Sequence, residues 1–404
     1  MIRRLLFPAI LIILTQGPGV LAQVNCTAGS SASGKLICLI PNQLNLTQGS
    51  AQNLAFLNEA IGSQVSDLPL ATPASGVIYT IDPKLNIPVP SNATLGPILT
   101  QRAETIGRHK FYIAFTYQYF QFEDIDGMGL KNLPIFLPLQ GGNVVTATNN
   151  RLDLKASQFT AYFTYGLTSS IDVSVAVPII DMHERMTTSG IEYSLVPPIG
   201  STSFTNKASP DGSATGIGDV NLAAKWRAWK LKHGGLAVGA ELRLPSGESE
   251  NFLGAGTIGA RPFAVFTYGS RISPHFNIAY EVNGDTNLVT NSSGSNGHLP
   301  NRLIYSGGAD WAITRWVTLA ADVLEQRVFD AQRINTVSYT IPNPNLTYPS
   351  INAFTGSYNR TDGSVGIKFK PFKTFIVTAN ILMKLDQPGL RARNVPLGGL
   401  SMTF

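Results

Sequence analysis

Residues 218–244, GDVNLAAKWRAWKLKHGGLAVGAELRL, decide the class of fold. In 218–229 the polar side chains fall on odd positions and the apolar ones on even positions, and 235–244 alternates in the same way. A period of two is the signature of a strand with one apolar face. The turn between the two segments is short, and Trp226 and Trp229 stand at its edge. The stretch therefore predicts an antiparallel hairpin with aromatic residues beside its turn.

The same unit repeats from His109 to the last residue. Alternating segments are joined in turn by a very short connection and a long polar one, with five short and six long connections in all. An even number of strands with this alternation of loop length is the pattern of bacterial outer-membrane barrels. We expect an all-β, antiparallel up-and-down barrel of twelve strands, with polar loops at 121–158, 179–217 and 327–361. The predicted strands are 110–120, 159–166, 171–178, 218–229, 235–244, 261–269, 275–282, 302–313, 316–326, 362–370, 374–385 and 395–404.

Aromatic residues flank all five short turns, and they include all four Trp of the chain. Amphipathic rings collect at the bilayer interface, so they predict one rim of the barrel. The last strand, VPLGGLSMTF, carries Leu400, Met402 and Phe404 on one face. It must pair with the first strand, because open sheet edges are not tolerated in lipid. A terminal aromatic resembles the sorting signal that barrel-assembly machinery reads, so this machinery and outer-membrane lipid are expected partners.

The first 22 residues predict a secretory signal peptide. Arg3 and Arg4 precede the apolar run Leu5–Leu14, which is too short to span a bilayer as a helix, and cleavage is expected after Ala22. Removing the two arginines lowers the formal net charge from +5 to +3. No run of Lys or Arg follows the signal, so nucleic acid is not an expected partner. Export and the barrel pattern together predict the outer membrane of a Gram-negative-type cell.

Residues 23–106 do not have the barrel pattern and form a predicted N-terminal extension to a barrel at 107–404. Cys26 and Cys38 are the only cysteines, and in an exported protein we expect them to form a disulfide. Apolar residues from Leu54 to Leu68 recur at helical spacing and predict one short helix. Two interpretations of the extension stay open: a periplasmic arm, or a plug inside the lumen.

Strand alternation also assigns charged side chains to the lumen. A charge that faces the middle of the bilayer costs about 2–4 kcal/mol, so these residues are expected to point inward. They comprise six acids and six bases, a balance that argues against a strongly ion-selective pore. They either pair with one another in a rigid network or line a solute path. The candidates are Asp172, Asp219, Lys225, Arg227, Glu241, Arg243, Glu281, Arg302, Asp310, Asp322, Lys368 and Lys384.

Motifs that suggest catalysis are weak in this chain. GAGTIG (254–259) matches a dinucleotide-binding pattern but follows a polar loop and runs into another strand, so it is interpreted as a loop. His183 lacks the second His of a zinc-protease motif. An outer-membrane phospholipase requires a Ser beside a His, and no His-x-Ser pairing occurs. His109, His233 and His275 fall at strand starts or short turns, where an interfacial role is expected. We expect no enzyme, no cofactor and no metal site.

Three segments carry a resemblance to a known family. GIGDVNLAAKWRAW, GLAVGAELRLPSGES and the tail GLRARNVPLGGLSMTF resemble the outer-membrane family named for the MetA pathway of phenol degradation. The likeness covers roughly 109–404. It implies a transporter-like barrel that passes small aromatic or other hydrophobic molecules as a passive channel, and it carries over no ligand residues. The alternatives are a non-conducting envelope or adhesion barrel, a barrel-embedded hydrolase, and a soluble secreted β-protein.

Overall fold

The computed structural model describes residues 26, 34–43, 55–65, 68–70, 79–81, 88–90, 93–139, 143–208, 211–290, 296–341, 345–372 and 374–404. The predicted signal peptide, 1–22, lies outside these residues. Among the helices in the described ranges, none is long and apolar enough to cross a bilayer.

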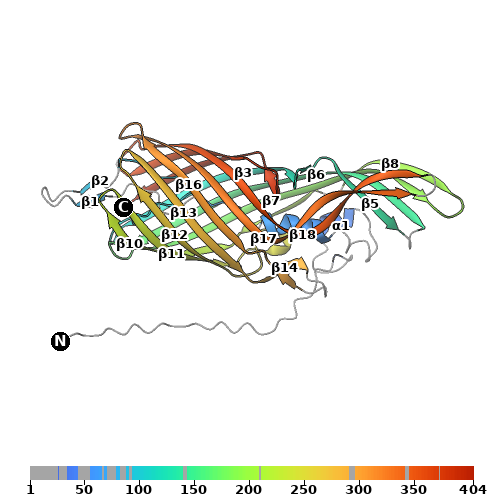
Figure 1. The fold of residues 1–404 in the computed structure, drawn as a ribbon, viewed down its shortest axis with the longest axis horizontal. Helices are drawn as coiled ribbons and strands as arrows, with labels where there is room; N and C mark the ends of the chain where they lie inside the picture. Colours follow the sequence, from blue (N-terminus) through green and yellow to red (C-terminus); the bar gives the residue numbers. More distant parts are fainter. Residues whose placement is uncertain are drawn as a thin grey trace, which may run out of the picture.

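Twelve antiparallel strands close into a barrel, which confirms the predicted fold and strand number (Figure 1). The first and last of these strands, β3 and β21, pair in register from Tyr112↔Thr403 to Gln118↔Leu397 and remove both edges of the sheet. At the rim, the Phe404 amide donates to the Phe111 carbonyl over 2.8 Å. In order around the wall the strands are β3 (Phe111–Ile125), β6 (Val144–Gly166), β7 (Ile171–Ser194), β10 (Val220–Leu231), β11 (Gly234–Leu244), β12 (Gly259–Tyr268), β13 (Ile272–Asn283), β16 (Arg302–Ala312), β17 (Val317–Ile341), β18 (Leu346–Phe369), β19 (Phe375–Lys384) and β21 (Asn394–Thr403).

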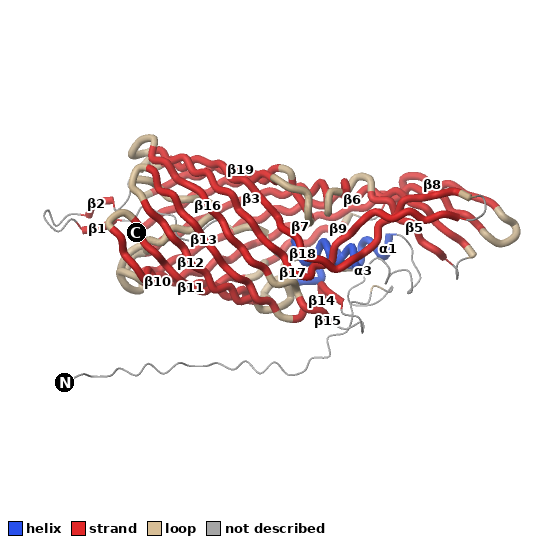
Figure 2. The backbone as a smooth tube through the Cα atoms, in the orientation of Figure 1, coloured by secondary structure: helices blue, strands red, loops and turns tan. Residues whose placement is uncertain are grey.

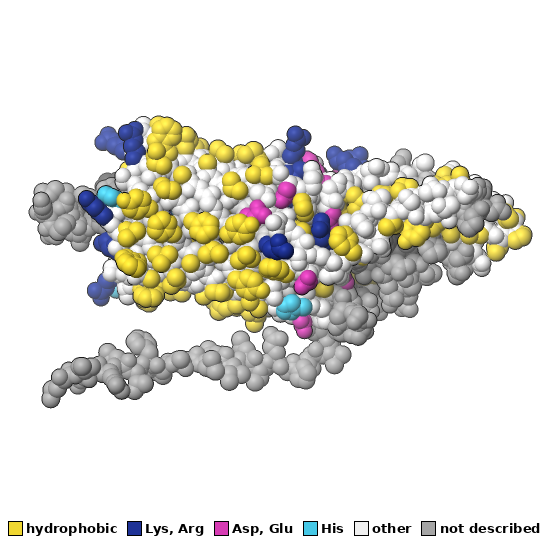
Figure 3. Space-filling model, viewed as in Figure 1, with side chains coloured by type: hydrophobic (Ala, Val, Ile, Leu, Met, Phe, Trp, Pro, Cys, Tyr) yellow, Lys and Arg dark blue, Asp and Glu magenta, His cyan; other side chains and the backbone are white. Residues whose placement is uncertain are grey.

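The outer surface of the barrel is apolar. Side chains on the outward parity of the strands, such as Trp226 (52% exposed) and Leu242 (45% exposed), have no protein covering them. Figure 3 shows a broad band of apolar side chains around the barrel wall, with Lys and Arg at one end and charges of both signs at the other. A surface of this kind is stable against hydrocarbon and unfavourable in water. The protein is therefore an outer-membrane β-barrel.

Four strands extend far beyond the membrane wall and form a tower. β6 pairs with β3 as far as Leu154 and then continues to Val144, about 30 Å at the rise of a strand. The regions predicted as loops at 121–158, 179–217 and 327–361 are thus largely strand, with the hairpin of β17 and β18 projecting beside that of β6 and β7 (Figure 2). The apolar residues of these segments, among them Leu152, Leu154 and Met182, are buried and point inward, while their outward neighbours are polar or charged, so the segments lack the apolar outer face by which a lipid-facing strand is recognised. Three shorter strands complete the tower: β5 (Leu133–Leu139), β8 (Gly200–Ala208) and β9 (Gly212–Ile217).

The N-terminal extension contributes the 3₁₀ helix η1 (Leu36–Cys38) and the helices α1 (Leu39–Gln43) and α3 (Ala55–Val65), which lie at the tower end of the barrel (Figure 2). The small hairpin of β1 (Tyr79–Ile81) and β2 (Pro88–Pro90) lies at the opposite end, beside the C-terminus (Figure 1). Because this opposite end carries the short turns, it is the periplasmic end. The remaining short elements lie in the outer connections: β4 (Met128–Gly129), η3 (Ser249–Asn251), β14 (Asp285–Thr290), β15 (Asn296–His298) and β20 (Leu390–Ala392).

Candidate functional site: the barrel lumen

Residues 94–106, which we call the floor segment, are almost entirely buried inside the periplasmic end of the barrel. Three of its backbone amides donate to inward side chains of the wall: Leu95 to Thr318 Oγ1 (2.9 Å), Ala103 to Thr267 Oγ1 (3.0 Å), and Ile106 to Asp172 Oδ2 (3.0 Å). These acceptors come from three different strands, so the floor segment is fixed across the lumen and not along one side of it.

Two lysines of the wall hold the backbone carbonyls of the floor segment. The Lys225 ammonium donates to the carbonyls of Arg102 (3.1 Å) and Glu104 (2.9 Å). The Lys368 ammonium donates to the carbonyls of Leu95 (3.4 Å) and Pro97. Both lysines are buried. Burial makes these charge-assisted bonds strong, because a buried ammonium without acceptors is costly.

His275 joins the floor segment to two acids of the wall. Its Nε2 lies 2.6 Å from Asp322 Oδ1 and 2.8 Å from Thr100 Oγ1 of the floor segment, and its Nδ1 lies 3.3 Å from Asp310 Oδ1. The imidazole is completely buried. The predicted interfacial role of His275 is therefore wrong. Its odd position on β13, the same parity as Glu281, was the available signal that the side chain points inward.

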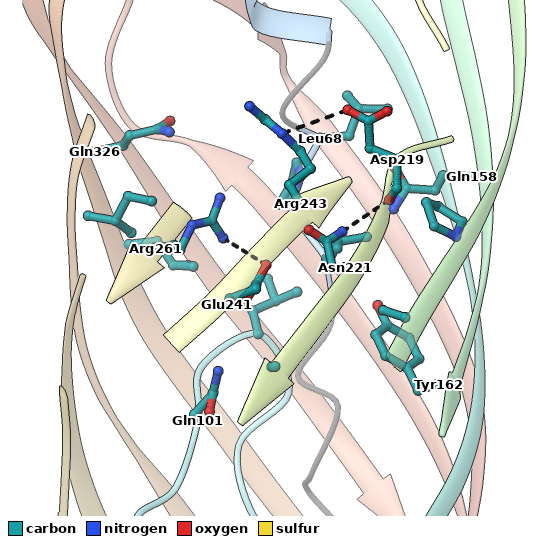
Figure 4. Close-up of a pocket in the computed structure, with 18 of the residues that line it drawn as sticks. Leu68, Gln101, Gln158, Tyr162, Asp219, Asn221, Glu241, Arg243, Arg261 and Gln326 are labelled. Atoms are coloured by element: carbon teal, nitrogen blue, oxygen red, sulfur yellow. Dashed lines mark hydrogen bonds and ion pairs between the residues drawn. The ribbon is translucent and has the colours of Figure 1, made fainter. Parts of the chain in front are cut away.

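A second charge cluster surrounds Arg243 in the middle of the lumen (Figure 4). The Arg243 guanidinium lies 3.2 Å from Glu281 and 3.7 Å from Asp219, and it donates to Asn283 over 2.6 Å. Arg261 reaches Glu281 (2.6 Å) and Glu241 (3.6 Å). Each arginine is thus shared between two carboxylates, which offsets the desolvation of the charges. Arg261 was not predicted, although it starts the strand segment RPFAVFTYG on the inward parity.

Asp219 also organises the loop that resembles a dinucleotide motif. Its carboxylate accepts hydrogen bonds from the backbone amides of Gly247 (3.0 Å) and Ala255 (2.8 Å). The segment 254–259 is therefore folded back over a wall carboxylate, and its glycines allow this close approach. Its amides are engaged by the protein itself, in agreement with the interpretation of GAGTIG as a loop.

At the outer end of the lumen, charged residues hold α3. Arg302 donates to the carbonyl of Ser63 over 2.7 Å, and Gln64 accepts from the amide of Leu390. Nearby, Arg391 binds Asp362 (2.8 Å) and Asp386 (3.2 Å). The apolar face of α3, formed by Leu57, Ile61 and Val65, is buried against the barrel interior.

Between α3 and the floor segment lies a cavity of about 230 Å³. Figure 4 shows part of its lining: Asp219, Glu241, Arg243 and Arg261 lie in the same region of the lumen as Gln158 and Tyr162, with Leu68 above and Gln101 below. Apolar side chains of the wall and extension complete it, among them Leu99, Ile304 and Leu324. The lining is therefore amphipathic: it combines apolar surface with the charge network around Arg243 and with a second charged group, Glu325, Arg360 and Asp362.

The structure places the twelve candidate lumen residues as follows. Arg227, Glu241 and Lys384 are half-buried, and the other nine are buried. Arg227 donates to the carbonyl of Ser169 in a periplasmic turn, and Lys384 contacts Asp124. All twelve have at least one polar partner, most in the three groups around His275, Arg243 and α3.

The other candidate residues lie at the two ends of the chain. Cys26 and Cys38 are bonded to each other, with Cα atoms 5.3 Å apart. Leu400 (48% exposed), Met402 (37%) and Phe404 (61%) all lie on the outer face of β21.

The sequence of this chain matches a family of known proteins. Residues 138–338 match the model of the family described as "Putative MetA-pathway of phenol degradation". The chain belongs to this family. No curated protein matches this chain.

Three solved structures are similar to this chain. An outer-membrane channel from Pseudomonas putida F1 is 12% identical, with a TM-score of 0.43 over 75% of this chain and 98% of that one. The NanC porin is 8% identical, with a TM-score of 0.37 over 72% and 98%. The toluene transporter TbuX of Ralstonia pickettii is 10% identical, with a TM-score of 0.28 over 84% and 99%.

Proposed function

We propose that the protein is a passive outer-membrane channel for small molecules, including aromatic and other hydrophobic compounds, and that its N-terminal extension acts as a plug that narrows the path. The observation that carries the proposal is the amphipathic cavity enclosed by the barrel wall, α3 and the floor segment. Membership of the phenol-degradation family supports a one-ring aromatic solute with a polar substituent. Such a molecule matches a lining that combines charged and polar groups with apolar surface.

The charge pattern supports a path without strong ion selectivity. Around the cavity, arginines and carboxylates are shared in one network, so neither sign dominates. The two lysines that hold the floor segment bind backbone carbonyls, and these bonds can be exchanged for water without unfolding the wall. We infer that opening is a displacement of the floor segment, with the barrel unchanged.

The test is single-channel conductance of the refolded mature chain in a planar bilayer. Wild type should show small, discrete openings. Replacing Lys225 and Lys368 by Met removes the donors to the floor carbonyls and should raise the conductance or the open time severalfold. The matched control replaces Lys230 and Lys232, two exposed lysines of a periplasmic turn, by Met, and it should behave as wild type.

Solute choice is tested with the same proteins in liposomes. Phenol should enter faster through the floor variant than through wild type, and addition of phenol should reduce the current in the bilayer. If both wild type and floor variant are silent although heat-modifiable migration on a gel verifies the folded barrel, the channel proposal is wrong and a non-conducting envelope barrel takes its place.

A further inference from the structure

The periplasmic rim of the barrel is basic. Residues 107–110 and the described residues of the five short turns together contain seven Lys and Arg residues and no Asp or Glu. By contrast, the outer connections contain acids and bases together. Figure 3 shows Lys and Arg gathered at this end of the barrel, next to the apolar band. The seven basic residues are Arg108, Lys110, Lys230, Lys232, Arg271, Arg315 and Lys370.

On one side of this rim the surface forms a groove of about 960 Å³. It runs from the β16–β17 turn across the β18–β19 turn to the seam where β21 meets β3. We call it the rim groove. It is lined by Lys110, Arg315, Trp316, Lys370, Pro371, Phe372, Thr374, Phe375, Met402, Thr403 and Phe404.

Arg315 and Lys370 both line the rim groove and meet at Trp316. The Arg315 guanidinium lies over the Trp316 ring, 4.8 Å from its centroid, and the backbone amide of Lys370 donates to the backbone carbonyl of Trp316 over 2.8 Å. Partial burial and the positive charge of Arg315 both lower the pKa of Lys370. An anion between the two side chains would remove this repulsion.

The net charge of the rim groove is positive. Among the described residues that line it, three side chains are cationic and none is acidic. The groove therefore favours a ligand with net negative charge.

The other half of the rim groove is apolar and faces the bilayer. Phe372 is 70% exposed, Phe404 61% and Trp316 41%, and all three lie in or beside the short turns and the β21–β3 seam. A small soluble anion would leave this apolar surface exposed to water, whereas the acyl chains of a lipid would cover it. We propose that the rim groove binds an anionic phospholipid of the periplasmic leaflet, with its phosphate between Arg315 and Lys370 and its chains against Phe372 and Phe404.

The test is native mass spectrometry of the refolded full chain, released from micelles that contain equal amounts of phosphatidylglycerol and phosphatidylcholine. Wild type should retain phosphatidylglycerol in preference. The double variant Arg315→Gln, Lys370→Gln should retain it on the order of 20-fold less, since each basic residue near the surface contributes about 1 kcal/mol. The phosphatidylcholine signal should change little in either protein.

The matched control is Lys230→Gln, Lys232→Gln, which removes the same charge from the opposite part of the rim. It should retain phosphatidylglycerol as wild type does. Equal loss in both variants would show a diffuse attraction to the rim and overturn the assignment of a site. Displacement of the lipid by inorganic phosphate alone would also overturn it, because it would show that the acyl chains are not needed.

Discussion

At the scale of single residues, Gly96 determines whether the floor segment can fold. Its φ is +83°, a conformation that side chains of L-residues rarely adopt, and a Cβ added there would lie 1.9 Å from a terminal nitrogen of Arg102. Arg102 is buried, so it has little room to move away. The floor segment can therefore turn at this point only because residue 96 has no side chain beside Arg102.

We predict that Gly96→Ala loosens the floor segment by about 1–3 kcal/mol while the barrel stays folded. The measurement is single-channel conductance together with heat-modifiable migration, and the expected result is longer openings with unchanged migration. Gly129→Ala serves as control, since nothing lies within 4 Å of a Cβ built there. If the two variants conduct alike, Gly96 does not control the floor segment.

The alternation of polar and apolar residues along the strands predicts many lumen residues, because a charged side chain that faces lipid is energetically costly. Asp219, Arg243 and Glu281 were found in this way from three separate strands. Their contacts with one another could not be predicted from the sequence, because the pairing register of the strands and the closure of the barrel decide which inward side chains meet. Arg102 was missed because its segment has no period at all, and it is placed by tertiary contacts alone.

At the scale of elements, the start of the extension is tied to an outer loop by one ion pair. Lys35 binds Glu248, and this hydrogen bond lowers the pKa of the Glu248 carboxyl. The Leu36 amide also donates to Asn251 of η3 over 3.1 Å. The 3₁₀ helix η1 is thus attached to the outer connection between β11 and β12.

This contact predicts a pH dependence. A carboxyl whose pKa is lowered by folding contributes stability above its unfolded value, 4.5, and loses that stability as pH falls through the folded pKa. Glu248→Gln should therefore speed hydrogen exchange of residues 34–40 a few-fold at pH 7, in line with ~0.2–1 kcal/mol for an exposed pair. At pH 3 variant and wild type should coincide. An equal difference at both pH values would contradict the ion-pair account.

Elements with an apolar face were predictable, and elements without one were not. The wall strands alternate because one side meets lipid, so their number and order follow from the sequence. The tower strands have no apolar outer face, and they form because each continues a hairpin already started in the wall. Phe136 stacks on Tyr339, with ring centroids 5.3 Å apart, and this contact joins the two tower hairpins. No periodic pattern in the sequence predicts it.

At the scale of the whole molecule, the tower hairpin of β17 and β18 shares no strand pairing with the neighbouring wall strands β16 and β19. β17 pairs with β16 no further than Val328, and β18 pairs with β19 no further than Asp362. Beyond these points the two strands pair with each other. The contacts that close the barrel and hold the floor segment lie at the other end, at the β21–β3 seam and around His275.

We therefore predict that the tip of this hairpin can be removed without loss of the barrel. Replacing residues 338–349 by an Asn-Gly turn keeps the register, because Val337 and Ser350 are paired neighbours. The shortened protein should keep its heat-modifiable migration and its conductance, while loss of the partner of Phe136 should loosen β5. The contrasting variant lacks residues 395–404; it opens the seam, leaves two sheet edges in lipid and should not fold into a membrane. If shortening the tower also abolishes folding or changes conductance, the tower is part of the channel and the wall alone does not define the path.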